Sequence, residues 1–139
     1  MVLMPSKMKY RKLQKGSMSG LAKNGFLVEF GEFGMQALNR GWVSAQEIEA
    51  ARIAINKHFS RKGKLWIRVY PNKPTTKKPL ETRMGKGKGG THLWVAVVRP
   101  GNILFEVGDI PKELAKKALR LAAAKISLKT RFVERIEKI

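Results

Sequence analysis

Hydrophobic residues along the chain recur with two periods, which predict short strands and two helices. Phe26, Val28 and Phe30 alternate with their neighbours, as the side chains of a strand do. A bend containing two glycines follows, and residues 35–38 predict a second short strand. Alternation returns over residues 64–70, which predict a third strand with one face toward the core.

The first helix is predicted over residues 43–62. Ser44 and Glu47 have the spacing of a capping box, and Gly63 stands where a helix ends. The apolar stripe recurs at helical spacing as Ile48, Ala51, Ile55 and Phe59. Cations that complement the macrodipole gather near the C-terminal end as Lys57, Arg61 and Lys62.

The second half of the chain predicts a hairpin, a helix and a last strand. Residues 93–98 are continuously apolar, as in a central strand buried on both faces. A Pro-Gly turn then leads into residues 103–107, which complete the hairpin. Pro111 opens a helix to about Lys125, and residues 128–135 alternate with one basic face. The buried stripe of this helix is predicted to be Leu114, Ala118 and Leu121, with Lys112, Lys116 and Arg120 on the far side.

These elements predict an α+β fold. The order is strands, helix, strand, loop, hairpin, helix and strand, which favours a mixed, mostly antiparallel sheet with two helices on one side. The 139 residues are expected to form a single domain.

A long loop is predicted over residues 71–91. Three prolines stiffen its first half, and its second half places each lysine between glycines. Loops of more than about 12–15 residues are usually functional or disordered. A stiff stalk with a bare cationic tip suits insertion into folded nucleic acid, and a solvated basic loop is the alternative.

Residues 1–25 predict an extended basic arm that folds against a partner, with a solvated tail as the alternative. Glycines interrupt any long helix, and the segment contains no acidic residue. Its cations are Lys7, Lys9, Arg11, Lys12, Lys15 and Lys23.

The formal net charge of +19 makes a polyanion the expected partner. Further cations are expected on the strand at 64–70, the long loop and the last strand, and the whole set is assigned to RNA binding. On the strand at 64–70, covering a neighbouring helix is an equally good reading of the aromatic and basic face. The cations are Arg68, Lys73, Lys77, Lys78, Lys129 and Arg131. Charge spread over separate surfaces indicates contact with several phosphate backbones.

The chain offers little for catalysis or metal binding. Cysteine is absent and only two histidines are present, His58 and His92. Neither a metal site nor a catalytic triad is expected from these, and no cofactor is predicted. Residues 85–90 match G-x-G-x-x-G, but a buried strand follows where a dinucleotide site needs a helix. No run of 18 apolar residues predicts a bilayer span, and the start lacks the apolar region of a signal peptide.

Several stretches resemble the large-subunit ribosomal protein family called L-sixteen in bacterial and organellar naming. The resemblance runs nearly end to end. Its segments are Lys9-Tyr10-Arg11-Lys12, Ile48-Glu49-Ala50-Ala51-Arg52, Lys64-Leu65-Trp66-Ile67-Arg68-Val69, Lys77-Lys78-Pro79, Glu81-Thr82-Arg83-Met84-Gly85-Lys86-Gly87-Lys88-Gly89 and Trp94-Val95-Ala96-Val97-Val98.

The resemblance implies an α+β protein embedded in large-subunit ribosomal RNA (rRNA), near A- and P-site tRNA and the peptidyl-transferase region. It implies no enzyme activity, neighbouring ribosomal proteins as partners, and a bacterial cytoplasmic or organellar ribosome as the location. A homo-oligomer and a membrane partner are not expected. The implied tRNA-proximal tip is Arg83, Met84, Gly85, Lys86, Gly87 and Lys88. The sequence departs from the family pattern at Ser6-Lys7-Met8, at Ser17 and Ser19 and at His92-Leu93.

Three other functions remain as rivals. The charge alone also suits a protein that compacts nucleic acid without specificity. Basic helices suit an amphipathic membrane binder, although their apolar stripes are short and core-like. An enzyme using Glu81 and His92 is the weakest, because both lie in or beside a glycine-rich loop.

Overall fold

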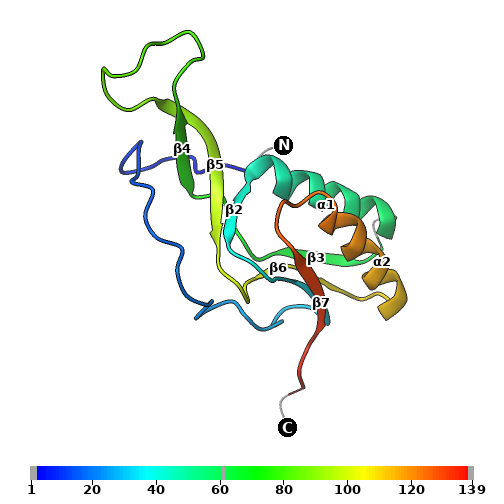
Figure 1. Ribbon diagram of the computed structural model, residues 1–139. Coiled ribbons are helices and arrows are strands. Elements are labelled where there is room, and N and C mark those ends of the chain that lie inside the picture. The colour runs from blue at the N-terminus through cyan, green and yellow to red at the C-terminus, as the bar shows by residue number, and fades with distance from the viewer. Residues whose placement is uncertain (1–2, 61, 138–139) are drawn as a thin grey trace.

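Two helices pack side by side against strands that form two antiparallel sheets (Figure 1). The computed structural model describes residues 3–60 and 62–137. Within these residues, no helix is both long and apolar enough to cross a membrane. The elements in chain order are β1 (Phe33–Ala37), β2 (Gly41–Ser44), α1 (Ala45–Phe59), β3 (Lys64–Ile67), β4 (Lys73–Lys77), β5 (Gly90–Val98), β6 (Ile103–Gly108), α2 (Lys112–Ala123) and β7 (Thr130–Glu134).

The strands confirm the α+β class and divide the expected single sheet into two. One sheet has the order β3-β6-β1-β7 and the other β2-β5-β4, with antiparallel neighbours in both. The expected hairpin of β5 and β6 is wrong, because the two strands lie in different sheets. The turn between them is present, with Asn102 N–H donating to the Arg99 carbonyl at 3.1 Å. It turns the chain from one sheet into the other.

Helix α1 keeps the predicted cap and stripe. Glu47 N–H donates to Ser44 Oγ at 3.2 Å, and Ser44 N–H donates to Glu47 Oε2 at 3.1 Å. All four stripe residues are buried. The helix is shorter than expected, because residues 43–44 belong to β2 and Ser60 takes a left-handed conformation at the C-terminus with φ of 49°. Arg61 lies outside the described residues.

Helix α2 buries a different stripe from the expected one. Ala118 is buried as predicted, whereas Leu121 is 50% exposed and Leu114 is half-buried. The buried residues are Ala115, Ala118, Leu119 and Ala122. Three of the four are alanines, and such small side chains allow α2 to approach α1 closely. The cations Lys112, Lys116 and Arg120 are exposed, as expected.

Strand β6 forms the centre of the core. All six of its residues are buried, and it lies between β1 and β3. Strand β5 is the middle strand of its sheet, but its first three residues are exposed because it extends away from the body. Over residues 93–98, for which burial on both faces was expected, Val95, Ala96 and Val98 are buried and the other three residues are half-buried. Strand β3 ends at Ile67, earlier than predicted.

Candidate nucleic-acid interface

Strands β4 and β5 carry a segment that stands away from the body of the molecule (Figure 1). We call β4, β5 and the loop 78–89 between them the projection. The pairing runs from Lys73 opposite Val95 to Lys77 opposite Gly90. Thr75 Oγ1 also donates to the Leu93 carbonyl at 3.0 Å.

The long loop expected over 71–91 is therefore narrower than predicted. Residues 73–77 and 90–91 lie in strands. Pro71, Pro74 and Pro79 suggested a loop here, since proline usually interrupts a sheet. Strand β4 is an edge strand, where the missing N–H of Pro74 costs no ladder hydrogen bond.

The tip of the projection is bare. Leu80 is 94% exposed and Met84 is 96% exposed. Gly85, Lys86 and Gly87 all have positive φ, at 103°, 60° and 87°. Glycine adopts this region without strain, so the glycines around Lys86 turn the chain back sharply and present the lysine to a partner. Within the loop, Thr82 N–H donates to the Pro79 carbonyl at 3.1 Å, and Lys78 Nζ donates to the Gly85 carbonyl.

The end of the loop at Gly89 packs closely against the last residue of β4, Lys77. A Cβ at this position would lie 2.8 Å from the carbonyl carbon and oxygen of Lys77. No side chain fits there without movement of the backbone. At Gly90, by contrast, a Cβ would meet nothing within 4 Å.

Residues 3–25 of the basic arm contain neither helix nor strand, and residues 12–15 contact the projection. Its contacts with the projection use lysine ammonium groups and backbone carbonyls. Lys12 Nζ donates to the Lys88 carbonyl at 3.0 Å, and Lys88 Nζ donates to the Leu13 carbonyl at 2.6 Å. Lys73 Nζ donates to the Lys15 carbonyl. The arm thus rests on the chain's own projection, although we expected it to fold against a partner.

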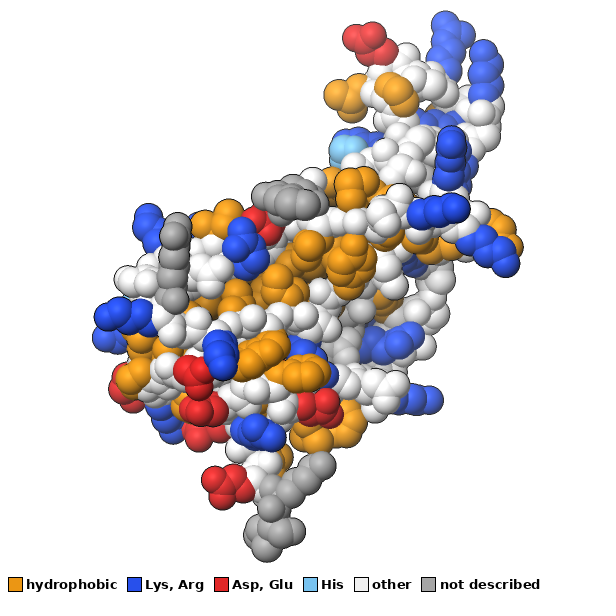
Figure 2. Space-filling model, turned by 180° about the vertical axis from the view of Figure 1, so that it is seen from behind, with side chains coloured by type: hydrophobic (Ala, Val, Ile, Leu, Met, Phe, Trp, Pro, Cys, Tyr) orange, Lys and Arg blue, Asp and Glu red, His pale blue; other side chains and the backbone are white. Residues whose placement is uncertain are grey.

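Cations line both the arm and the projection. Figure 2 shows Lys and Arg side chains over the projection. The six arm cations are exposed, as are Lys77, Arg83, Lys86 and Lys88, while Lys73 and Lys78 are half-buried. Lys73 also lies over the Trp42 ring, with Nζ 5.0 Å from the centroid. Glu81 is the only acidic residue between positions 71 and 91. Such a surface suits a phosphate backbone.

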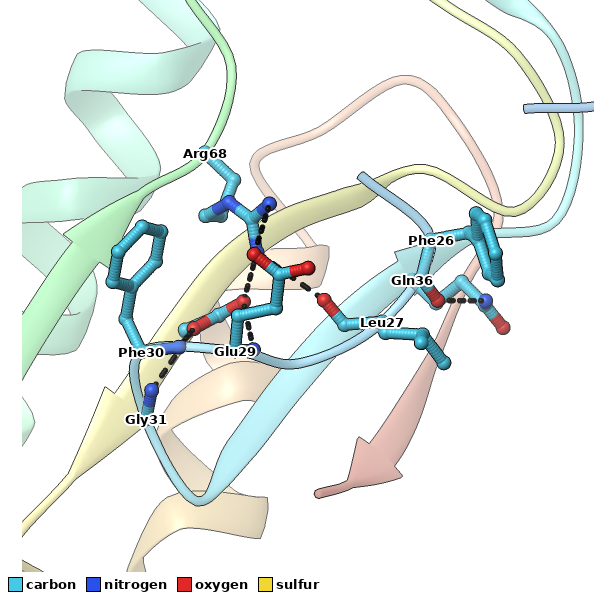
Figure 3. Close-up of polar contacts among 8 residues, drawn as sticks. Phe26, Leu27, Glu29, Phe30, Gly31, Gln36 and Arg68 are labelled. Atoms are coloured by element: carbon cyan, nitrogen blue, oxygen red, sulfur yellow. Dashed lines mark hydrogen bonds and ion pairs between the residues drawn. The ribbon is translucent and has the colours of Figure 1, made fainter. Parts of the chain in front are cut away.

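The arm is joined to the body by a buried carboxylate (Figure 3). Glu106 in β6 is wholly buried. It accepts hydrogen bonds from three consecutive backbone N–H groups, of Glu29 at 3.1 Å, Phe30 at 2.7 Å and Gly31 at 2.9 Å. Arg68 completes the site with an ion pair to Glu106.

These bonds explain why the strand expected at 26–30 does not form. Its N–H groups bind a carboxylate where a strand would bind a neighbouring strand. Val28 is buried, while Phe26 and Phe30 are 46% and 58% exposed, so the three do not share a buried face. Gly31 must pass close to β6, since a Cβ there would lie 2.5 Å from the Val107 carbonyl oxygen.

Opposing effects set the pKa of Glu106. Burial raises the pKa, because a charged carboxylate is costly away from water. The N–H groups of Gly31, Glu29 and Phe30 and the guanidinium of Arg68 all favour the charged form. Together they hold the pKa below its ordinary value, so the Glu106 carboxylate is charged at neutral pH and is paired with Arg68.

Arg68 has a structural role at this site. Its side chain is 14% exposed, donates to the Leu27 carbonyl at 3.2 Å and lies over the Phe30 ring at 5.0 Å. Trp66, on the same expected face, packs near Gly108, where a Cβ would lie 3.1 Å from the Trp66 ring. Only Tyr70 of this face is largely exposed, at 47%. Sequence reasoning missed Glu106, although an acidic residue inside the apolar run 103–107 was a usable signal.

The predicted cations of the last strand lie on a second surface, away from the projection (Figure 1). Lys129 and Arg131 are both exposed. Arg131 Nε donates to Gln36 Oε1 at 2.7 Å, and Lys129 N–H donates to Asn39 Oδ1 at 3.0 Å. The structure therefore brings residues 12–15 of the arm to the projection, and leaves Lys129 and Arg131 on another part of the molecule.

The chain is similar to ribosomal proteins along its whole length. Residues 5–133 match a family described as ribosomal protein L16p/L10e. A protein named large ribosomal subunit protein uL16 from Protochlamydia amoebophila is 61% identical over 139 residues, covering 100% of each chain. Another of that name from Chlamydia felis is 60% identical over 138 residues, covering 99% of this chain and 100% of the relative.

Proposed function

The chain belongs to the ribosomal protein L16p/L10e family, and from that premise we propose that it binds rRNA and contacts tRNA as a structural constituent of the large ribosomal subunit. The observation that carries the proposal is the exposed cationic surface shared by the arm and the projection. Members of this family are structural proteins, and we propose no catalytic role for the chain.

The arm and residues 73–78 of the projection are the proposed rRNA contacts. Most of their cations are exposed, and only Lys73 and Lys78 are half-buried, so a phosphate backbone binds without unfolding any helix or strand. The proposed contacts are Lys7, Lys9, Arg11, Lys12, Lys15, Lys23, Lys73, Lys77 and Lys78, with Lys129 and Arg131 on the second surface. We leave out Arg68, because its guanidinium is committed to Glu106 and Leu27.

The tip is the proposed contact with A- and P-site tRNA near the peptidyl-transferase centre. Arg83, Met84, Gly85, Lys86, Gly87 and Lys88 form it. Its narrow backbone and exposed side chains fit a crowded RNA environment, where a bulkier loop would collide with neighbouring strands. The relatives come from bacteria, which favours a bacterial cytoplasmic ribosome over an organellar one.

Sedimentation and competition test the proposal together. Tagged full-length protein is expected to sediment with intact large subunits, and large-subunit rRNA is expected to compete for it far better than duplex DNA of equal length. Equal competition by both nucleic acids would identify a nonspecific compacting protein, which the charge of +19 alone also allows.

A further inference from the structure

A groove separates α2 from β7, on the second surface of the molecule. It encloses about 490 Å³. An ion pair between Lys112 and Glu134 joins the two elements at one end. Residues 124–129 connect α2 to β7 at the other end. We call this the α2–β7 groove.

The helix side of the groove has a net positive charge. Lys116, Lys117 and Arg120 line it and are exposed, and the exposed carboxylate of Glu113 also lines it. Among the described residues, none of these three forms an ion pair. Lys116 and Arg120 are four residues apart, so their like charges repel on the same helix face. An anion in the groove would remove this repulsion.

The floor of the groove is apolar and partly aromatic. Met35 and Leu119 are 1% and 2% exposed, and Phe132 is half-buried. The Phe132 ring stacks on Phe33, with centroids 5.5 Å apart and planes at 25°. Cations alone would bind a phosphate backbone, and an apolar floor would add nothing to that binding. An unstacked nucleotide needs both, because its base packs on apolar or aromatic surface while its phosphate binds cations.

Strand β7 adds hydrogen-bonding capacity. It lies at the edge of its sheet, with β1 on one side only. An edge strand presents unpaired backbone N–H and C=O groups, and these match the donors and acceptors on the edge of a base. A peptide could also pair with this edge, but the three cations favour an anionic occupant.

We infer that the α2–β7 groove binds an unstacked nucleotide of RNA, with its base on Phe132 and its phosphate at Lys116, Lys117 and Arg120. The inference rests on the proposed function, since it takes rRNA as the partner. It adds a site that the arm and the projection do not include, on another side of the protein.

Two full-length variants test the base contact and the phosphate contact separately. For each, the affinity for purified large-subunit rRNA is measured over a series of salt concentrations. Phe132→Leu is expected to weaken binding about tenfold without changing the salt dependence, because stacking is lost while the phosphate contacts remain. Lys116→Gln with Lys117→Gln is expected to lower the slope of log affinity against log salt by about 1.5.

Matched controls define the background. Leu121→Ala removes an exposed apolar side chain from the same helix outside the groove, and is expected to bind as the wild type does. Lys57→Gln with Lys62→Gln removes two exposed charges elsewhere. Thermal melting of each variant identifies any that lose binding by unfolding. The Lys116→Gln, Lys117→Gln double variant tests the groove without changing a side chain of the hydrophobic core.

The outcomes distinguish this inference from the proposed function. If arm variants weaken rRNA binding while both groove variants match their controls, the groove inference is overturned and the proposed function stands. If arm variants have no effect either, the proposed function fails. If the groove variants keep rRNA affinity but lose contact with a neighbouring ribosomal protein in assembled subunits, the groove binds a peptide and the inference is wrong.

Discussion

Arg68 and Glu106 form an ion pair beneath the segment that joins the basic arm to the body. The carboxylate is wholly buried, and the arginine side chain is 14% exposed. Three backbone N–H groups share the same carboxylate. The pair therefore holds residues 29–31, which follow the C-terminal end of the arm, against β6.

Replacing this carboxylate by an amide is expected to destabilise the fold. Glu106→Gln leaves the largely buried Arg68 with only the exposed carboxylate of Glu29 at 3.9 Å, and breaking one partner of a buried pair costs about 3 kcal/mol. Urea unfolding measures the change in free energy. Glu81→Gln is the control, because Glu81 is exposed in the loop of the projection. Equal stability of both variants would contradict a structural role for the pair.

Stability is expected to fall in acid through two carboxylates. The hydrogen bond from Arg52 lowers the pKa of Glu49 from 4.5 to about 2, and the pKa of Glu106 is also lowered. A lowered folded-state pKa gives stability that is complete above the unfolded value and is lost as the pH falls toward the folded one. The unfolding free energy should therefore decline as the pH is lowered from about 5 to about 2.

Variants test the origin of that decline. Glu49→Gln lacks the contribution of this carboxylate to stability at every pH. Its unfolding free energy should therefore depend less on pH than that of the wild type. Glu81→Gln should keep the wild-type slope. Parallel curves for all three proteins would assign acid unfolding to overall charge repulsion.

The tip is expected to matter for tRNA and hardly at all for stability. Arg83 and Lys86 are exposed and form no ion pair among the described residues, so Arg83→Ala with Lys86→Ala should leave the unfolding free energy within about 0.5 kcal/mol. tRNA binding to reconstituted large subunits should weaken. Lys88→Ala is tested separately, since Lys88 also binds the Leu13 carbonyl. Matching losses of melting temperature and tRNA binding in the double variant would count against a purely functional tip.

Two adjacent glycines offer a direct test of the projection. Gly89→Ala places a Cβ 2.8 Å from the Lys77 backbone and is expected to cost about 1–3 kcal/mol locally. Gly90→Ala meets nothing within 4 Å and should be neutral. Amide hydrogen exchange over β4 and β5 measures the effect. Similar exchange in both variants would show that the loop does not close as described.

Salt should weaken rRNA binding steeply. A protein that neutralises about 6–10 phosphates loses about 10³–10⁵ in affinity between about 50 and 200 mM salt. Lys7→Gln with Lys9→Gln should reduce the slope by about 2, because each lysine is exposed and contributes one contact. An almost flat salt response of the wild-type protein would exclude phosphate binding as its main source of affinity.

Local signals predicted local structure well. The capping box of α1 and its stripe follow from side chains a few residues apart, and both are confirmed. The bare, glycine-turned tip also followed from its own residues. In each case the chemistry and its partner lie within one short segment.

Pairings between distant segments were harder to predict. Nothing near the turn at 99–102 indicates that β5 pairs with β2 and β4 while β6 pairs with β1 and β3. The alternation of Phe26, Val28 and Phe30 predicts a strand only if another strand receives its N–H groups, and Glu106 receives them from more than 70 residues away. The contacts of Arg68 could not be predicted for the same reason, because its partner Glu106 lies 38 residues away in the sequence.

The lysine–carbonyl bonds from Lys12 to the Lys88 carbonyl and from Lys88 to the Leu13 carbonyl have a consequence for the proposed binding to RNA. Two flexible segments that search for separate sites on RNA would each lose freedom on docking. Here two hydrogen bonds already join the arm to the projection. If both bind RNA as proposed, they would dock as one unit and less freedom would be lost than by two independent segments.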